Sequence, residues 1–411
     1  MDPVIRPANS AILLKLQTAD DVPATPSPSA DAVPFEIDSM SYTGPFRNEA
    51  SNEASGSLVG AAPLVVGQPA TVRFRGRIKG AGAGATYSAS VKPPYHQAMA
   101  ACGWRGLFTA AVSAAALAAG TTTTATLGTG FAATAQVYRG MPVIMTGGVG
   151  AGAIPLIADY TASKVAMLTD VFGSALSATT SAAIPDNWTY AGTSPRDGTA
   201  RATDHPSATI YLYEDGTLHQ FINCRGVMTL DGQVSRPGYA SFEFTGTYVG
   251  TGSDAAVPTS LVIANHSAPI LVQGSGVSAA FLVNRKGLPI SQWALAETGT
   301  LESPEDPNTT YGFGAGQIGQ RAPMFTCDPL ATLIATRNTL SEIGNFAVQT
   351  AALRYLGAVG NRWSMMIAQA QPVGQEPGSR GTLRSHNLSY RALPVGRDPS
   401  DRDNEIVLSF F

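Results

Sequence analysis

The sequence predicts a mainly β protein, and three observations support this. Turn-forming residues are abundant, with 43 glycines and 28 prolines among 411 residues. Charged residues make up only 13% of the chain, about half of the share typical of soluble globular proteins. Several segments alternate apolar and polar residues with the period of a β-strand. The length and the 44% of hydrophobic residues allow two or three domains with sizeable cores.

Charge and cysteine content narrow the class of protein. The net charge of −3 offers no overall basic field for holding nucleic acid by its phosphates. Cys102, Cys224 and Cys327 are far apart and odd in number, which predicts reduced, buried thiols rather than disulfides or a metal pair. The first thirty residues show no basic start followed by an apolar run, and residues 107–119 are too short and too rich in Ala and Thr to span a bilayer. We expect the chain to stay in the cytoplasm where it is made, or to be assembled from there.

The first elements lead up to a charged strand. Residues 8–18 (ANSAILLKLQT) suggest a short helix or helical turn, residues 22–34 a Pro-rich connection, and the sheet is expected to begin near Phe35. Residues 41–62, rich in Gly, Asn, Ser and Glu, separate this point from the alternating strand at residues 67–80. Because loops of such length are uncommon inside compact domains, we expect residues 41–62 to be an arm that makes contacts elsewhere.

The strand at residues 67–80 has one apolar and one basic face. Its alternation places Val72, Phe74 and Ile78 on one side and Arg73, Arg75, Arg77 and Lys79 on the other. Either it is a half-buried strand with one face in water, or its basic face meets acidic groups of a neighbouring subunit.

A helix, an insertion and a hairpin follow. Residues 92–103 (KPPYHQAMAACG) predict a helix of about two turns that ends at Gly103. The composition then changes, and short Gly-punctuated segments predict a small inserted β module at residues 115–187. Residues 208–226 form the strongest hairpin signal, around Asp215-Gly216, and residues 239–250 add an alternating strand.

The last third of the chain repeats this order of elements. A strand, a helix with Thr339 or Ser341 as N-cap, a hairpin turning at 357–361 and a closing strand are expected, within segments 321–329, 339–351, 352–373 and 382–393. We interpret this order as an internal duplication. The expected domains are a first domain (1–114, continued at 188–255), the inserted module (115–187) and a second, similar domain (256–411).

Motifs for catalysis or cofactor binding are weak. Residues 314–319 fit GxGxxG, but no clear strand precedes them and Pro323 follows before a helix could receive a pyrophosphate. The five histidines form no HExxH or i, i+4 pair, and GxSxG is absent. The acidic residues at 302–306 lie in a Pro-containing turn, where a solvated loop is the ordinary explanation. We expect no enzymatic activity and no metal, cofactor or catalytic residue.

Several segments in this order resemble the tail tube (major tail) proteins of long-tailed, non-contractile bacteriophages. The likeness covers roughly residues 8–105 and 188–411, from AILLKLQT through GQPATVRFRGRIKGAG to the terminal EIVLSFF. Its most specific parts are the helix that ends in Ala-Cys-Gly and the hairpin that runs through Gly216 into Cys-Arg-Gly.

The resemblance implies a β-sandwich or barrel-type tube domain with a flanking helix, without catalytic residues. Such proteins form rings with sixfold or pseudo-sixfold symmetry that stack into the tube through which the genome passes. The implied location is the virion tail, assembled in the bacterial cytoplasm, and the implied partners are further copies of the chain, the tail terminator, the tape measure and the baseplate proteins. The duplication predicts three chains in each ring, with six as the alternative. Candidate contact residues between subunits are Arg47, Asn48, Glu49, Glu53, Arg73, Arg75 and Arg77.

Two departures and two alternatives accompany this interpretation. Relatives often carry acids where this chain has Arg73, Arg75 and Arg77, and the insertion at 115–187 interrupts the usual connection from helix to strand. One alternative is a tail terminator or baseplate adaptor. The other is a receptor-binding or polysaccharide-acting tail fibre, which would need a carboxylate pair in an aromatic-lined groove.

Overall fold

The protein is mainly β in the computed structural model, with 43% of its residues in strands and 5% in helices. The structure describes residues 4–51, 54, 56, 59, 62–195, 197–263, 269–296, 298–396 and 403–411. The prediction of a β-rich class is confirmed. The described strands form several sheets, and no closed barrel is found among them.

In the described part of the chain, the first part of the large sheet contains seven strands, all antiparallel to their neighbours. Their order is β2 (Ala32–Val33), β1 (Ser10–Leu16), β16 (Ala208–Glu214), β17 (Thr217–Gln233), β18 (Tyr239–Tyr248), β6 (Ala70–Arg77) and β3 (Ser41–Tyr42). The predicted hairpin at Asp215-Gly216 is confirmed, since Glu214 pairs with Thr217.

The expectation of a helix at residues 8–18 is wrong, because β1 lies there between β2 and β16. Four successive residues of this strand, from Ala11 to Leu14, are buried. A strand buried on both faces has a continuous apolar run, which periodicity cannot distinguish from a short buried helix. The sheet therefore begins at Ser10 and not near Phe35.

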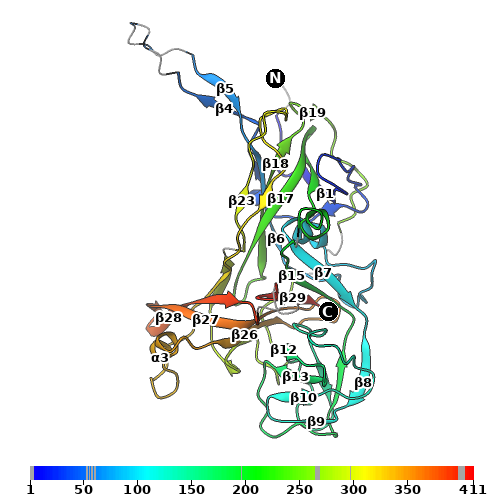
Figure 1. The fold of residues 1–411 in the computed structure, drawn as a ribbon, viewed down its shortest axis with the longest axis vertical. Helices are drawn as coiled ribbons and strands as arrows, with labels where there is room; N and C mark the ends of the chain where they lie inside the picture. The colour runs from blue at the N-terminus through cyan, green and yellow to red at the C-terminus, as the bar shows by residue number, and fades with distance from the viewer. Residues whose placement is uncertain are drawn as a thin grey trace.

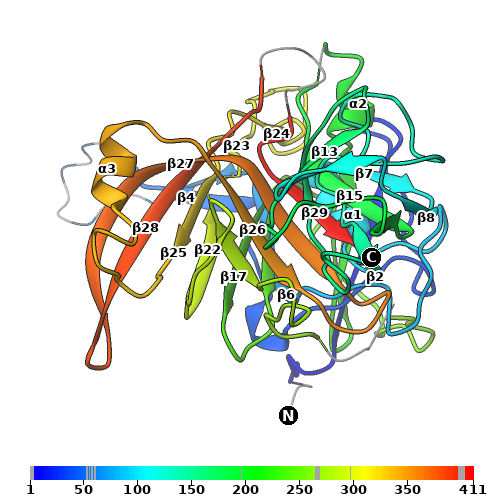
Figure 2. The same cartoon turned by 90° about the horizontal axis from the view of Figure 1, so that it is seen from below.

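The second part of the large sheet also contains seven strands among the residues that the structure describes. Their order is β21 (Lys286–Gly287), β20 (Phe281–Val283), β26 (Gln349–Tyr355), β27 (Trp363–Arg380), β28 (Leu383–Leu393), β25 (Met324–Cys327) and β22 (Gln292–Ala296). Strand β22 also pairs with the end of β17, at Leu230–Gln233, and this joins the two parts. Figure 2 shows β22 and β25 between β17 and β28.

Three further strands connect the first half of the chain to β27 in the second half. β7 (Trp104–Thr109), β15 (Asn187–Gly192) and β29 (Val407–Phe410) pair in this order, and β29 continues onto the start of β27. β19 (Ser253–Asp254) pairs in the same way with the start of β17. One hydrophobic core extends through both halves, from Ile12 to Phe410. The three cysteines are free and buried, as predicted.

The helices are short. The predicted helix before Gly103 is confirmed as α1 (His96–Ala101), and Gly103 has the positive φ of 74° that ends it. α2 spans Arg201–Asp204, and a 3-10 turn spans Ile37–Ser39. α3 (Thr339–Gly344) is capped by Asn338, whose side chain accepts a hydrogen bond from the Ser341 amide. The expected N-caps, Thr339 and Ser341, are therefore wrong by one and three positions.

Residues 112–184 have a hydrophobic core of their own. One small sheet holds β11 (Ile144–Thr146), β14 (Ser181–Ile184) and β8 (Val112–Ala116), and the other holds β12 (Ile157–Tyr160), β13 (Val165–Leu168), β10 (Thr124–Thr126) and β9 (Ala119–Gly120). Figure 1 shows this segment at the lower end of the molecule, next to β26 and β29. Its Leu156 and Ala158 pack in one cluster with Leu282, Met366 and Val407.

Two small hairpins leave the large sheet at corresponding places. β4 (Phe46–Glu49) and β5 (Leu64–Gly67) lie between β3 and β6 in the chain, and they project away from the body (Figure 1). β23 (Leu301–Glu302) and β24 (Gln317–Ile318) lie between β22 and β25. Part of the predicted arm at 41–62 is thus β3 and β4, and several of its later residues lie outside the described ones.

Candidate assembly surfaces

The arginines of β6 line one exposed face of the large sheet. Strand alternation buries Val72 and Phe74 and points the arginines to the opposite side. Each arginine meets a carboxylate of the same chain: Arg73 with Glu243 at 2.6 Å, Arg75 with Asp231 at 2.5 Å and Arg77 with Glu36 at 2.6 Å. The acids that complement this row therefore come from the adjacent strand β18, from β17 beyond it and from the turn before β3.

These ion pairs are partly exposed, so they add little stability but balance the charge of the face. The hydrogen bond that Arg73 donates to the Glu243 carboxylate raises the pKa of Arg73. Burial raises the pKa of Asp231 even though Arg75 opposes this effect. The Arg75 guanidinium also lies 4.0 Å from the ring centre of Tyr239, which holds it along the sheet.

The same face continues into the second half of the chain as a polar surface. A groove across β17, β22, β25, β28 and β27 is lined by small and polar side chains, among them Asp231, Ala294, Thr326, Glu376 and Asn387. Asp231 belongs both to this groove and to the pair with Arg75. We call the surface from β3 to β27 the polar sheet face.

The projecting hairpin carries the other predicted contact residues. Arg47, Asn48 and Glu49 lie on β4 and are exposed, whereas Glu53 lies outside the described residues. The hairpin base is fixed, because Phe46 packs edge-on against Tyr311 at 5.4 Å. The backbone of Tyr311 also lies so close to Gly67 that a Cβ there would clash.

The hairpin exposes apolar side chains as well, since Leu64 and Val65 are 65% and 61% exposed. Such residues on a protruding element are typical of a contact with another protein. The predicted residues thus form two separate sets. One lies on the hairpin and the other on the polar sheet face, and the structure does not gather them into one site (Figure 1).

The polar sheet face ends at two strand edges. At one end β3 pairs with β6 on one side, and its other side is unpaired in the described part of the chain. At the other end β27 pairs with β28 as far as Arg380, while β26 accompanies its other side only to Ala370. Unpaired strand edges can add a strand from another chain.

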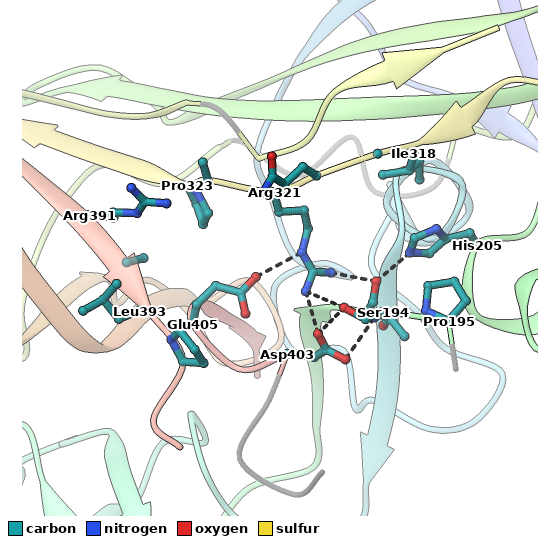
Figure 3. A pocket seen from close by; sticks show the side chains of 16 residues that line it. Ser194, Pro195, His205, Ile318, Arg321, Pro323, Arg391, Leu393, Asp403 and Glu405 are labelled. Atoms are coloured by element: carbon teal, nitrogen blue, oxygen red, sulfur yellow. Dashed lines mark hydrogen bonds and ion pairs between the residues drawn. The ribbon is translucent and has the colours of Figure 1, made fainter. Parts of the chain in front are cut away.

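A cavity between the two halves holds a polar cluster around Arg321 (Figure 3). Arg321 contacts Asp403 at 2.7 Å and Glu405 at 3.2 Å, and it donates to the Thr193 carbonyl at 2.7 Å. Burial raises the pKa of Glu405, with Arg321 opposing this effect. These contacts attach the segment before β29 to the end of β15.

The polar side chains around Arg321 form hydrogen bonds with one another and with the backbone. The Ser194 hydroxyl donates to Asp403 at 2.6 Å, and His205 Nε2 donates to the Thr193 carbonyl at 2.6 Å. Burial lowers the pKa of His205. Because His205 is turned to a backbone carbonyl, it is not placed to take a proton from Ser194. The arrangement supports a structural role.

Sequence reasoning missed the partners of the charged residues. Glu243 and Asp231 point outward in alternating strands, so their side of the strand could be predicted, but their pairing with β6 depends on a register across more than 150 residues. Arg321 belongs to no recognisable sequence motif, so its role could not be predicted. The GxGxxG segment nearby contributes Gln317 and Ile318 to β24, so it does not open a helix.

The described residues contain no group of three His, Cys, Asp or Glu side chains that could hold a metal ion. Among them, too, no helix is long and apolar enough to cross a membrane. No family model matches the chain, and no curated protein matches it significantly.

Proposed function

We propose that this chain is the tail tube protein of a long-tailed, non-contractile bacteriophage, a structural subunit whose rings stack into a conduit for DNA. The observation that carries the proposal is the polar sheet face. It is continuous over eight strands, its arginines are paired with acids, and it ends at two unpaired edges among the described residues. Closing such a sheet into a ring removes both edges.

The charge balance of this face suits a conduit. Each phosphate held by an unpaired Lys or Arg adds affinity and slows the passage of DNA. Here Arg73, Arg75 and Arg77 already have carboxylates within 2.6 Å, so the row is neutralised before DNA arrives. The arginines therefore do not conflict with a conduit function, although relatives often carry acids on this strand.

Strand pairing supports two tube domains in one chain, in line with the element order. In the first half the pairing order is β2, β1, β16, β17, β18, β6, β3, and in the second it is β21, β20, β26, β27, β28, β25, β22. The chain visits these strands in the same sequence in both halves, with a short helix before each final hairpin. Each half also has a small hairpin, β4–β5 before β6 and β23–β24 before β25. In each half a short strand then pairs with the start of the longest strand, β19 with β17 and β29 with β27.

A ring of six such domains closes with three chains. Each chain then contributes one junction between its own domains and one junction to the next chain. The segment 112–184 belongs on the outside, because a lumen open to DNA has no room for about 70 extra residues per chain.

Negative-stain microscopy of the purified protein at high concentration tests the proposal. Long tubes about as wide as a phage tail are expected. Isolated rings that never stack support a terminator or adaptor. Monomers or elongated trimers that cleave glycans support a tail fibre, and either result would overturn the proposal.

A further inference from the structure

We propose that the unpaired edge of β27 binds the β3 edge of the next copy of this chain, so that the junction between chains repeats the junction inside the chain. This inference rests on the proposed function, and it names the two surfaces that meet. The two edges stand at opposite ends of the polar sheet face. An interface that joins different surfaces of identical subunits is the kind that closes into a ring.

The junction inside the chain supplies the template. The last residues of β17 pair with β22 in antiparallel register, from Leu230 with Leu295 to Gln233 with Gln292. This pairing extends the sheet from the first half into the second without a break. It uses the side of β17 that β16 has left, beyond the β16 pairing at Cys224.

The equivalent elements are β27 and β3. In pairing order β27 corresponds to β17, and β3 corresponds to β22, since β3 precedes and pairs with β6 just as β22 precedes and pairs with β25. Beyond Ala370, no strand in the described residues pairs with the side of β27 that β26 has left, although α3 packs against β27. The outer side of β3 is likewise unpaired among them. The two strands of the internal junction, β17 and β22, thus correspond to the two strands with open edges, β27 and β3.

A second contact of the internal junction points to the same partner. The segment after β6 packs on the turn between β26 and β27, where the Gly80 amide donates to Asn361 Oδ1 at 2.8 Å and Tyr87 donates to the Gly360 carbonyl at 3.0 Å. The equivalent segment after β25 contains Leu333 and Ile334, which are 79% and 73% exposed. By the same relation it should pack on the turn at Asp215-Gly216 of the next chain, which would cover these side chains.

Pro377 limits what else this edge can bind. Proline lacks an N–H donor, and in sheets it is confined to edges, where it weakens unwanted pairing. The β27 edge is therefore a poor general template. It needs the additional contact at Leu333 and Ile334 to hold a strand, which favours a copy of this chain over an unrelated strand.

Disulfide trapping in assembled tubes tests the pairing. Ser41 pairs with Arg73, and Glu376 pairs with Asn387, so both side chains lie on the polar sheet face. If the strands are neighbours, their Cβ atoms come within about 5 Å, close to the separation that a disulfide needs. The variants are Ser41→Cys with Glu376→Cys and, for a register two residues away, Ser41→Cys with Gly374→Cys. The three native thiols are buried, and burial raises their pKa, so background oxidation is low.

Oxidation should move most of the chain from monomer to dimer and trimer bands on a denaturing gel in at least one of the two variants. The matched control is Ser41→Cys with Asn387→Cys, one strand further away by about 4.8 Å, and it should stay monomeric. Tubes that form normally but leave both test variants monomeric would overturn this pairing while the tube function stands. A wild-type chain that forms no rings or tubes would overturn both.

A second readout does not depend on cysteine geometry. Leu333→Asp with Ile334→Asp should keep the melting temperature of the free subunit, because both side chains are exposed, and should abolish assembly. The matched control is Val171→Asp, which also replaces an exposed apolar side chain but lies on the segment 112–184. This variant should assemble at the wild-type yield. Tubes from the double variant at wild-type yield would contradict the proposed contact.

Discussion

The guanidinium of Arg354 contacts the carboxylate of Asp170 across the boundary between the segment 112–184 and the large sheet. The Arg354 side chain is fully buried, and it also donates to the Ala279 carbonyl at 2.7 Å and to Thr169 Oγ1 at 2.7 Å. Burial lowers the pKa of Arg354, and Asp170 counteracts this effect. The inserted segment is therefore attached to β26 by a desolvated charge pair.

Asp170→Ala should lower the free energy of unfolding by about 3 to 5 kcal/mol, because it leaves a buried cation without its counterion. Asp170→Ala with Arg354→Met should lose less than Asp170→Ala alone. Asp254→Ala, an exposed carboxylate on β19, is the control and should change stability by less than about 0.5 kcal/mol. Urea denaturation measures all three, and equal losses in the single and double variants would contradict the account.

Excision of residues 117–180 tests whether the inserted segment can be dispensed with. Ala116 and Ser181 are paired neighbours on β8 and β14, so an Asn-Gly turn can join them. The sequence favours a dispensable module, but the structure adds a cost: excision exposes the partners of Leu156 and removes Asp170 from Arg354. We expect a folded protein that is less stable than Asp170→Ala and that still assembles into tubes.

Adding Arg354→Met to the excised chain should recover part of the stability, because no buried charge is then left unpaired. Thermal melting of the two excised chains measures this difference. If neither yields soluble protein, the segment belongs to the main core and is not an insertion.

Shortening the projecting hairpin should separate folding from assembly. Arg47 pairs with Val66, so residues 48–65 can be replaced by Asn-Gly. All four residues of β4 are exposed and the main core lies elsewhere, so the melting temperature should stay close to that of the wild type. The shortened chain should fail to polymerise in microscopy and sedimentation. Tubes at normal yield would show that the hairpin is not an assembly contact.

His96 should make stability depend on pH. Burial, reinforced by Lys92 with its Nζ 3.3 Å from Nε2, lowers the pKa of His96 from 6.5 to about 4. Its Nδ1 lies 2.8 Å from the Tyr190 hydroxyl, and its ring packs edge-on against Trp188. Between these two pKa values the unfolded chain binds the proton more readily than the folded one. Stability present near pH 7 is therefore lost as the pH falls from 6.5 toward 4.

Between pH 7 and pH 5 this loss should amount to about 2 kcal/mol. In His96→Gln the difference in unfolding free energy between the two pH values should shrink by that amount, and in Lys92→Met it should shrink by less. Other titrating groups contribute equally to all three proteins. An unchanged difference in His96→Gln would show that this histidine titrates normally in the folded protein.

Local patterns predicted many of the elements. The alternation in β6 and the Asp215-Gly216 hairpin identified their strands, because neighbouring residues determine both features. β1 was missed because it is buried on both faces, and the cap of α3 was misplaced because Asn338, Thr339 and Ser341 are all residues favoured at N-caps. The arginine row of β6 could be placed on one face from sequence, but its acidic partners could not. They lie on strands whose register is decided by packing over long separations.

The symmetry of the ring provides the strictest test of the duplicated organisation. If each chain supplies two tube domains, a ring contains three chains of 42.5 kDa and has a mass of about 128 kDa. A single tube domain per chain would need six chains and about 255 kDa. Native mass spectrometry of rings distinguishes these masses, and averaged tube cross-sections should show threefold features, because the segment 112–184 occurs only once in each chain. Strict sixfold symmetry of identical chains would rule out the duplication, and it would also remove the template for the pairing of β27 with β3.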